Sequence, residues 1–243
     1  MSRRLLIVPI LATAAIGVVV FSAPAALPAA APPPAGYEPH LNPKNFSLTI
    51  DNPYYPLPVG RVWIYKGTKD GVSQVDRVEV TPYTKKVAEG ITARVVTDVA
   101  RHGNTLLEKT EDYYAQDDRG NVWYLGEHTT AYHDGHQDHS GSWEAGVNDG
   151  EPGIIMLAHP EIPNAYRQEY LYGKAEDTAW VVNVSGSFTV PLGTFRHVLN
   201  TLEFARIEPK VVDQKLYAPG VGIIFEKALS GPPEIARLVK MTG

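Results

Sequence analysis

The sequence has no cysteine among its 243 residues. Disulfides, thiolate metal sites, iron–sulfur clusters and cysteine nucleophiles are therefore excluded, and so is the lipid-attachment cysteine of a bacterial lipoprotein. Catalytic signatures are also missing, because the chain contains no G-x-S-x-G nucleophile elbow, no H-E-x-x-H zinc motif and no phosphate-binding loop. These absences favour a binding or structural protein and leave enzymatic activity unassigned.

Basic residues are in deficit, with 22 Lys and Arg against 27 Asp and Glu and a net charge of −5. Arg3 and Arg4 belong to an N-terminal segment that we expect to be removed, which makes the remaining chain more acidic still. Binding to nucleic acid or to an anionic membrane surface needs clusters of basic residues. The composition therefore excludes a nucleic-acid partner and argues against docking on such a membrane.

The first 25 residues have the pattern of a secretory signal peptide. Arg3 and Arg4 precede the apolar run 5–21, and Ala23-Pro24-Ala25 forms a cleavage site. An uncleaved anchor is the alternative, because the apolar run is close to the shortest length that spans a membrane. Residues 26–44 form an Ala/Pro-rich linker, and no later apolar run reaches spanning length. We therefore expect a secreted or cell-envelope protein whose mature chain has no membrane span.

Residues 45–243 are predicted to form a single β-rich domain. Short runs rich in β-branched and aromatic residues alternate with turns that contain Gly, Asp or Pro. A short helix is expected only around 174–178. This pattern predicts an all-β, mostly antiparallel fold in the form of a single curved sheet, half-barrel or barrel. The predicted strands are 61–66, 72–80, 91–99, 106–114, 121–125, 165–172, 180–190, 198–205, 211–217, 223–229 and 235–241.

Two turn segments near the C-terminal end carry a family resemblance. They are VPLGTF at 190–195 and YAPGVGII at 217–224. With weaker matches before them, these segments resemble a group of uncharacterised secreted bacterial β-rich proteins. The resemblance covers most of 54–230 and implies an exported antiparallel β-protein similar to the curved half-barrels that carry lipids. It implies no catalytic residues, and the histidine-rich stretch 133–139 departs from the group.

That histidine-rich stretch is the most pointed candidate site. Asp-Gly at 134–135 predicts a two-residue hairpin turn, which makes His133 and His136 direct cross-strand partners on one face. Asp138 follows on the same face. Two imidazoles and a carboxylate suit Zn²⁺ or Cu²⁺. The stretch therefore predicts a metal site at His133, His136 and Asp138, with a solvated polar loop as the alternative.

Aromatic residues form a second candidate site. Four Trp and 13 Tyr are present, and Tyr and Trp on alternating strand positions line concave ligand cavities in some β-proteins. The predicted ligand-binding residues are Trp63, Trp123, Trp143 and Tyr124. Stacking on sugars and ordinary core packing are the alternatives.

Acidic residues cluster at Glu108, Glu111 and Asp112, and Glu144 follows later. A pair of carboxylates across a cleft is what a glycosidase requires. We expect instead that these side chains lie on solvated strand faces, and that residues 117–120 (DDRG) form a hairpin turn.

Three functions are consistent with the sequence. The first is an exported β-domain that binds a lipid or another apolar or amphipathic small molecule in an aromatic-lined concavity. The second is a metal-binding protein or metalloenzyme that uses the histidine-rich hairpin. The third is a structural protein of the cell envelope.

Overall fold

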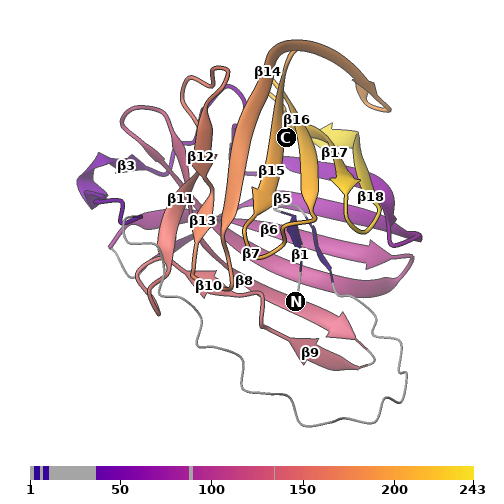
Figure 1. Cartoon of the computed structure of the whole chain (residues 1–243), viewed down its shortest axis with the longest axis horizontal. Coiled ribbons are helices and arrows are strands. Elements are labelled where there is room, and N and C mark those ends of the chain that lie inside the picture. The colour runs from indigo at the N-terminus through magenta and orange to yellow at the C-terminus, as the bar shows by residue number, and fades with distance from the viewer. Residues whose placement is uncertain (1–2, 6–7, 11–36, 88–89, 134) are drawn as a thin grey trace.

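Antiparallel strands make up most of the chain in the computed structural model, which describes residues 3–5, 8–10, 37–87, 90–133 and 135–243 (Figure 1). A separate two-stranded sheet joins β1 (Arg3–Leu5) to β2 (Val8–Ile10). The remaining strands form one sheet, and their bounds are β3 (Phe46–Ser47), β4 (Val62–Lys69), β5 (Val72–Lys86), β6 (Thr92–His102), β7 (Thr105–Asp117), β8 (Val122–His133), β9 (His136–Asp138), β10 (Trp143–Glu144), β11 (Glu151–Met156), β12 (Ala165–Arg167), β13 (Glu169–Tyr170), β14 (Asp177–Val190), β15 (Gly193–Ala205), β16 (Val212–Ala218), β17 (Gly222–Ser230) and β18 (Glu234–Thr242).

The large sheet curves until it is nearly a closed barrel. Its strand order is β12-β14-β15-β16-β17-β18-β4-β5-β6-β7-β8-β11-β13, and β3, β9 and β10 add to β7 and β8. Figure 1 shows β14 to β16 crossing in front of β5 to β8. Most neighbours are consecutive hairpins, whereas the pairing of β18 with β4 joins the last strand to the first long one. The predicted all-β, antiparallel curved sheet is confirmed.

Helix is nearly absent from the described residues. A single 3₁₀ turn spans Pro43–Asn45. The short helix expected around 174–178 is wrong, because Leu171 pairs with Ala175 across a tight turn and β14 begins at Asp177. Within the described residues no helix is long and apolar enough to cross a membrane. Of the predicted signal peptide only residues 3–5 and 8–10 are described, and most of the predicted linker lies outside the described residues.

Turn residues fix where the strands reverse. Asp70 and Gly71 have φ angles of 48° and 79°, the left-handed values that a two-residue hairpin requires, and Lys69 pairs with Val72 across them. At the DDRG turn, the Asp117 carboxylate accepts hydrogen bonds from the backbone N–H groups of Arg119 and Asn121 (3.0 and 2.8 Å). This predicted turn is confirmed.

Both C-terminal motif segments are hairpin corners. Residues 190–193 join β14 to β15, and residues 218–222 join β16 to β17. The second corner accepts hydrogen bonds from strand β4, because Trp63 Nε1 donates to Val221 O (2.8 Å) and Tyr65 Oη donates to Ile223 O (2.9 Å). These two side chains therefore attach the β16–β17 corner to the inside of the sheet.

A loop before β4 packs beside the same corner. Asn52 organises it, because its Nδ2 donates to the carbonyls of Gly120 and Leu157 (2.9 and 3.0 Å) while its Oδ1 accepts from the backbone of Tyr54 (2.9 Å). Gly220 N donates to Pro53 O (2.8 Å). The loop places Tyr55 in the main hydrophobic core.

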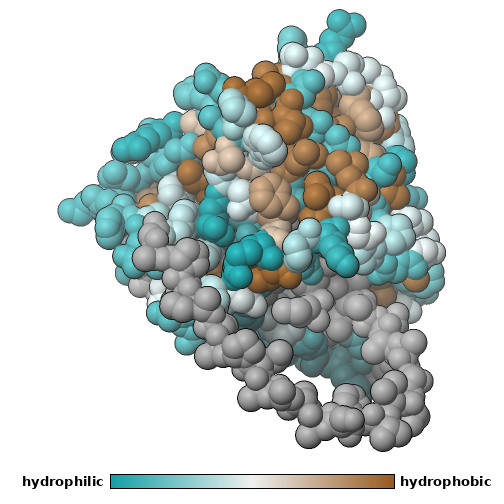
Figure 2. All heavy atoms as spheres, viewed as in Figure 1, coloured by the Kyte–Doolittle hydropathy of each residue, from teal (hydrophilic) through white to brown (hydrophobic). Residues whose placement is uncertain are grey.

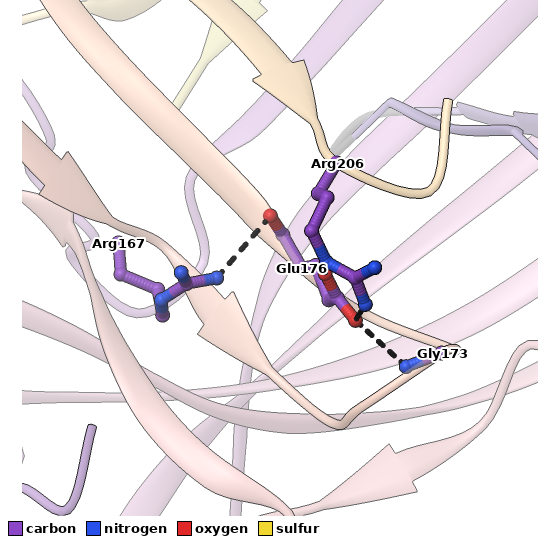
Figure 3. A network of polar contacts seen from close by, with 4 residues as sticks. All are labelled: Arg167, Gly173, Glu176 and Arg206. Carbon is purple, nitrogen blue, oxygen red and sulfur yellow. Dashed lines mark hydrogen bonds and ion pairs between the residues drawn. The ribbon is translucent and has the colours of Figure 1, made fainter. Parts of the chain in front are cut away.

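The start of β14 is held by a polar clamp (Figure 3). Glu176 is buried, and its carboxylate accepts two hydrogen bonds from the Arg206 guanidinium (2.7 and 2.6 Å) and one from Gly173 N (2.7 Å). Arg167 donates to the Glu176 carbonyl at 3.4 Å. A bidentate pair of this kind fixes geometry as well as charge, so the clamp ties the β13–β14 turn to the end of β15.

Hydrophobic side chains also gather on the outside of the sheet. Figure 2 shows them on the face where β14 and β15 lie in Figure 1. Trp180 and Phe204, on these strands, are 45% and 40% exposed. With these exposed fractions, neither side chain belongs to the hydrophobic core.

Candidate functional site

A chain of aromatic rings crosses the interior of the sheet. Tyr55 lies between Tyr217 (6.4 Å between ring centroids) and Tyr114 (5.5 Å). Tyr114 stacks on Tyr124 at 5.0 Å, and Tyr124 meets Trp143 edge-on at 5.4 Å. Offset and edge-to-face contacts of this kind stabilise a core beyond the area that the rings bury. The rings connect strands on opposite sides of the barrel.

Next to these rings the interior is strongly acidic. On β7, three buried polar residues alternate with exposed ones. The buried residues are Glu108, Thr110 and Asp112, and those between them are the exposed Lys109 and the half-exposed Glu111. Two lysines are buried among the described residues. The buried acids are Asp76, Asp98, Glu108, Asp112, Glu127, Glu169, Glu176, Glu203, Asp213, Glu226 and Glu234.

The two buried lysines have defined carboxylate partners. Lys69 Nζ lies 3.0 Å from Glu234 Oε2. Lys215 Nζ lies 2.7 Å from Glu203 Oε2 and 3.9 Å from Glu226 Oε1. Desolvation alone would lower the pKa of Lys215, but the nearby carboxylates outweigh it and the pKa is raised. Lys215 therefore stays protonated inside the sheet.

Burial raises the pKa values of several interior acids. Desolvation raises the pKa of Asp76 to about 7 and that of Glu108 to about 10. Desolvation also raises the pKa values of Asp98, Asp112 and Glu226 well above the ordinary range, with further increases from neighbouring carboxylates for Asp98 and Asp112. Several interior carboxyls thus keep their protons near neutral pH.

We expect the protein to lose stability as the pH rises from 5 to 8. A carboxyl whose pKa is raised by folding holds a proton in the folded chain when the unfolded chain has already released it. Its contribution to the free energy of unfolding is complete below the ordinary pKa. This contribution is lost progressively as the pH rises to the pKa in the folded chain, which is about 7 for Asp76 and about 10 for Glu108. Each such group costs about 1.4 kcal/mol per pH unit within its window. Urea unfolding at pH 5, 6.5 and 8 measures this.

The control for this prediction is a pair of neutral isosteres. Asp76→Asn and Glu108→Gln should each flatten the pH dependence, since neither amide titrates. A free energy of unfolding that increases from pH 5 to 8 would contradict the assignment.

The expectation of solvated acidic faces is wrong for two residues. Glu108 and Asp112 are 3% and 6% exposed, and Asp112 accepts a hydrogen bond from Tyr124 Oη at 2.8 Å. Glu111 and Glu144 are only partly buried, and Glu144 pairs with Lys85 at 2.7 Å. The predicted strand is present, but Glu108 and Asp112 lie on its buried face, where the charges of Lys69 and Lys215 act on them from distant strands.

A small cavity, here called the inner cavity, lies among these groups. Its volume is about 30 Å³. Aromatic side chains form much of its wall, and Asp98 and Asp112 form its acidic side. It is lined by Tyr55, Pro56, Leu57, Trp63, Tyr65, Val78, Val96, Asp98, Asp112, Tyr114, Gly222 and Ile223. It is too small for a lipid.

A larger concavity of about 250 Å³ lies beside the pairing of β10 with β8; we call it the β10 pocket. Gly126 has a φ of 130°, and a Cβ there would lie 2.6 Å from Trp143 O, so only glycine lets β10 come this close. The pocket is lined by Lys85, Tyr113, Glu127, His128, Ser142, Trp143, Glu144, Val147, Asn148, Leu171 and Lys174.

Polar groups in the β10 pocket hold one another in place. Lys85 Nζ lies over the Tyr113 ring at 4.6 Å while it pairs with Glu144. Lys174 Nζ donates to Ser142 O at 2.7 Å. The buried Trp143 Nε1 has no hydrogen-bond partner in the part of the chain that the structure describes. An aromatic wall, both signs of charge and an unused indole N–H are suited to an amphipathic small molecule.

The four predicted ligand-binding residues do not converge on one pocket. Trp63 lines the inner cavity, and Trp143 lines the β10 pocket. Tyr124 lies between Tyr114 and Trp143. Trp123 belongs to a second hydrophobic cluster and donates to Asp117 Oδ2 at 2.9 Å. Sequence reasoning missed Asp98 and Lys215, because the pattern of a single strand does not show which of its faces points inward.

The histidine-rich hairpin has the predicted register. His133 of β8 pairs with His136 of β9, and Ala131 pairs with Asp138; residue 134 lies outside the described residues. The Asp138 carboxylate accepts hydrogen bonds from Ser140 N and Oγ (2.8 and 3.0 Å), which hold its pKa below the ordinary value. Among the described residues no three His, Asp or Glu are grouped closely enough to hold a metal ion. The metal site stays a prediction.

Comparison with known proteins gives two distant structural neighbours. No protein-family model and no curated protein matches the chain. A candidate exported protein with a YmcC-like fold from Bacteroides fragilis is 14% identical with a TM-score of 0.46, over 79% of this chain and 100% of its own. A candidate lipoprotein from Parabacteroides distasonis is 13% identical with a TM-score of 0.41, over 79% of this chain and 99% of its own. Because both TM-scores are below 0.5, the fold described above is based on the strand pairings of this chain alone.

Proposed function

We propose that this protein is an exported β-domain that binds an amphipathic small molecule in the β10 pocket. The single observation that carries the proposal is a concavity of about 250 Å³ lined by the buried Trp143, whose indole N–H has no partner. Buried polar groups are nearly always hydrogen-bonded, so a ligand acceptor at Trp143 Nε1 would satisfy this one. Export follows from the predicted signal peptide.

The pocket favours a ligand with one apolar face and a polar edge. Trp143, Tyr113 and Leu171 supply apolar wall. The ammonium group of Lys85 pairs with Glu144, and that of Lys174 donates to Ser142 O. Both side chains are therefore positioned before a ligand binds. A lipid held inside the barrel is not proposed, because aromatic and charged side chains fill the interior.

Titration with 1-anilinonaphthalene-8-sulfonate tests the proposal, since this probe combines aromatic rings with one anionic group. We expect one saturable site per chain. Val147→Trp, at a 39% exposed position in the lining, should fill the pocket and weaken binding at least tenfold. Trp180→Ala, which removes an exposed aromatic outside the pocket, is the matched control and should leave binding unchanged. Equal binding by Val147→Trp and the unaltered protein would refute the proposal.

A second candidate function is metal binding at the hairpin, favoured by the direct pairing of His133 with His136. We expect His133→Ala and His136→Ala each to weaken Zn²⁺ or Cu²⁺ binding at least tenfold, because each removes one of the two paired imidazoles. His40→Ala, outside the hairpin, is the control. Isothermal titration of metal-free protein measures this, and unchanged stoichiometry in both variants would reject the site.

A further inference from the structure

The inner cavity contains a buried carboxylate with an unsatisfied oxygen. Asp98 is 6% exposed, and its Oδ1 makes no hydrogen bond to any described residue. Asp112, on the same wall, accepts one from Tyr124 at 2.8 Å. Burial raises the pKa of Asp98, so this acid holds its proton while the cavity is empty, and an ammonium ion beside it would stabilise the carboxylate form instead. The cavity therefore has a site where a positive group would be stabilised.

The chain's own buried amines are engaged elsewhere. Lys69 pairs with Glu234, and Lys215 pairs with Glu203 and lies near Glu226. Among the described residues neither amine has an ion pair with Asp98. Any compensating positive charge for Asp98 must come from another source.

The remaining walls of the cavity are suited to an organic ammonium ion, in which the charged nitrogen carries a carbon group. Trp63 Nε1 and Tyr65 Oη are bonded to backbone carbonyls of the β16–β17 corner. With these polar tips engaged, the two side chains contribute mainly ring surface to the lining, together with Tyr55 and Tyr114. Aromatic rings beside a carboxylate form the usual environment for ammonium groups in proteins.

We propose that the inner cavity is a binding site for a small primary ammonium ion, with Asp98 and Asp112 as its anionic partners and the aromatic rings as its walls. The volume of about 30 Å³ limits the ligand to a few heavy atoms, because a single water already needs about 10–15 Å³. Methylammonium fits this limit and tetramethylammonium does not. The site is separate from the β10 pocket and stands whether or not that pocket binds a ligand.

The experiment uses the Trp63 indole N–H as a local reporter. The probe is methylammonium chloride, added to ¹⁵N-labelled protein with sodium chloride at equal ionic strength as the reference. We expect the Trp63 indole peak to shift saturably, with a millimolar Kd because so few atoms make contact. The Trp123 and Trp180 peaks should stay in place. Tetramethylammonium should cause no saturable shift of the Trp63 peak.

Two amide variants locate the effect. Asp98→Asn keeps the shape but removes the charge, and we expect it to weaken methylammonium binding at least tenfold. Asp213→Asn alters a buried acid outside the cavity lining and should stay within about twofold of the unaltered protein. If Asp98→Asn fails to fold, the size cutoff between the two ammonium ions still decides. No shift up to 200 mM methylammonium, or an equal shift with tetramethylammonium, overturns the proposal.

Discussion

Lys215→Met is expected to destabilise the protein by about 3–5 kcal/mol at pH 7.5. Removing one member of a buried ion pair leaves an uncompensated buried charge, which costs this amount in measured cases. Lys215 is 1% exposed and holds Glu203 at 2.7 Å, with Glu226 at 3.9 Å. Methionine fills most of the volume of the lysine stem, so packing contributes little to the loss. Urea unfolding followed by tryptophan fluorescence measures the change.

Two further variants separate charge from packing. Lys227→Met alters the exposed lysine next to Glu226 on β17 and should change stability by less than about 0.5 kcal/mol. Adding Glu203→Gln and Glu226→Gln to Lys215→Met should recover much of the loss, because the orphaned carboxylates are then gone. A loss below about 1 kcal/mol at pH 7.5 would mean that Lys215 is not the counter-charge of this interior.

The curved sheet was predictable because each strand carries its own signal. Val78 and Val80 alternate with outward residues on β5, and Asp-Gly at 70–71 dictates the preceding turn. These signals are local, within one strand or one hairpin. Strands such as β5 and β8 run on through polar residues beyond the predicted runs. The strand β11 was not predicted, and the predicted strand 165–172 is divided into β12 and β13.

The interior charge was not predictable for a related reason. Asp76 shares a face with Val78 and Val80, and this mixed face fits a sheet surface as well as an interior. The partners that make the interior tolerable lie far away in sequence, as Lys69 and Glu234 do, and meet only when β18 pairs with β4. A pattern within one strand carries no information about such pairs.

The candidate site shows the same limit. Trp143 was predicted as a ligand-binding residue, but its pocket depends on Gly126, which lets β10 lie against β8. Trp123, one residue away from Tyr124, faces a different cluster because neighbouring residues on a strand point to opposite sides. The aromatic content of the sequence could not show that Trp123 and Tyr124 belong to different clusters.

Gly67→Ala is expected to cost about 3 kcal/mol or more, because it acts where β18 pairs with β4 and joins the C-terminal strands of the sheet to the N-terminal ones. A Cβ at Gly67 would lie 2.7 Å from the Ile235 carbonyl carbon, 2.9 Å from Ala236 Cα and closer still to Ile235 O. All of these are backbone atoms, which cannot rotate away as a side chain would. The only relief is to separate β4 from β18, and this is the pairing that brings Lys69 to Glu234.

The matched control is another glycine in a paired strand. At Gly186 of β14 the nearest atom to an added Cβ is Val198 O at 3.3 Å, so Gly186→Ala needs only a small adjustment and should cost less than about 1 kcal/mol. Urea midpoints of the two variants give the comparison, and amide hydrogen exchange on β4 and β18 shows where the loss occurs. If the β18–β4 pairing joins the two halves of the sheet as described, Gly67→Ala should release protection along both strands while β14 and β15 remain protected. Equal midpoints for the two variants would mean that the two strands do not approach as closely at Gly67 as the fold requires.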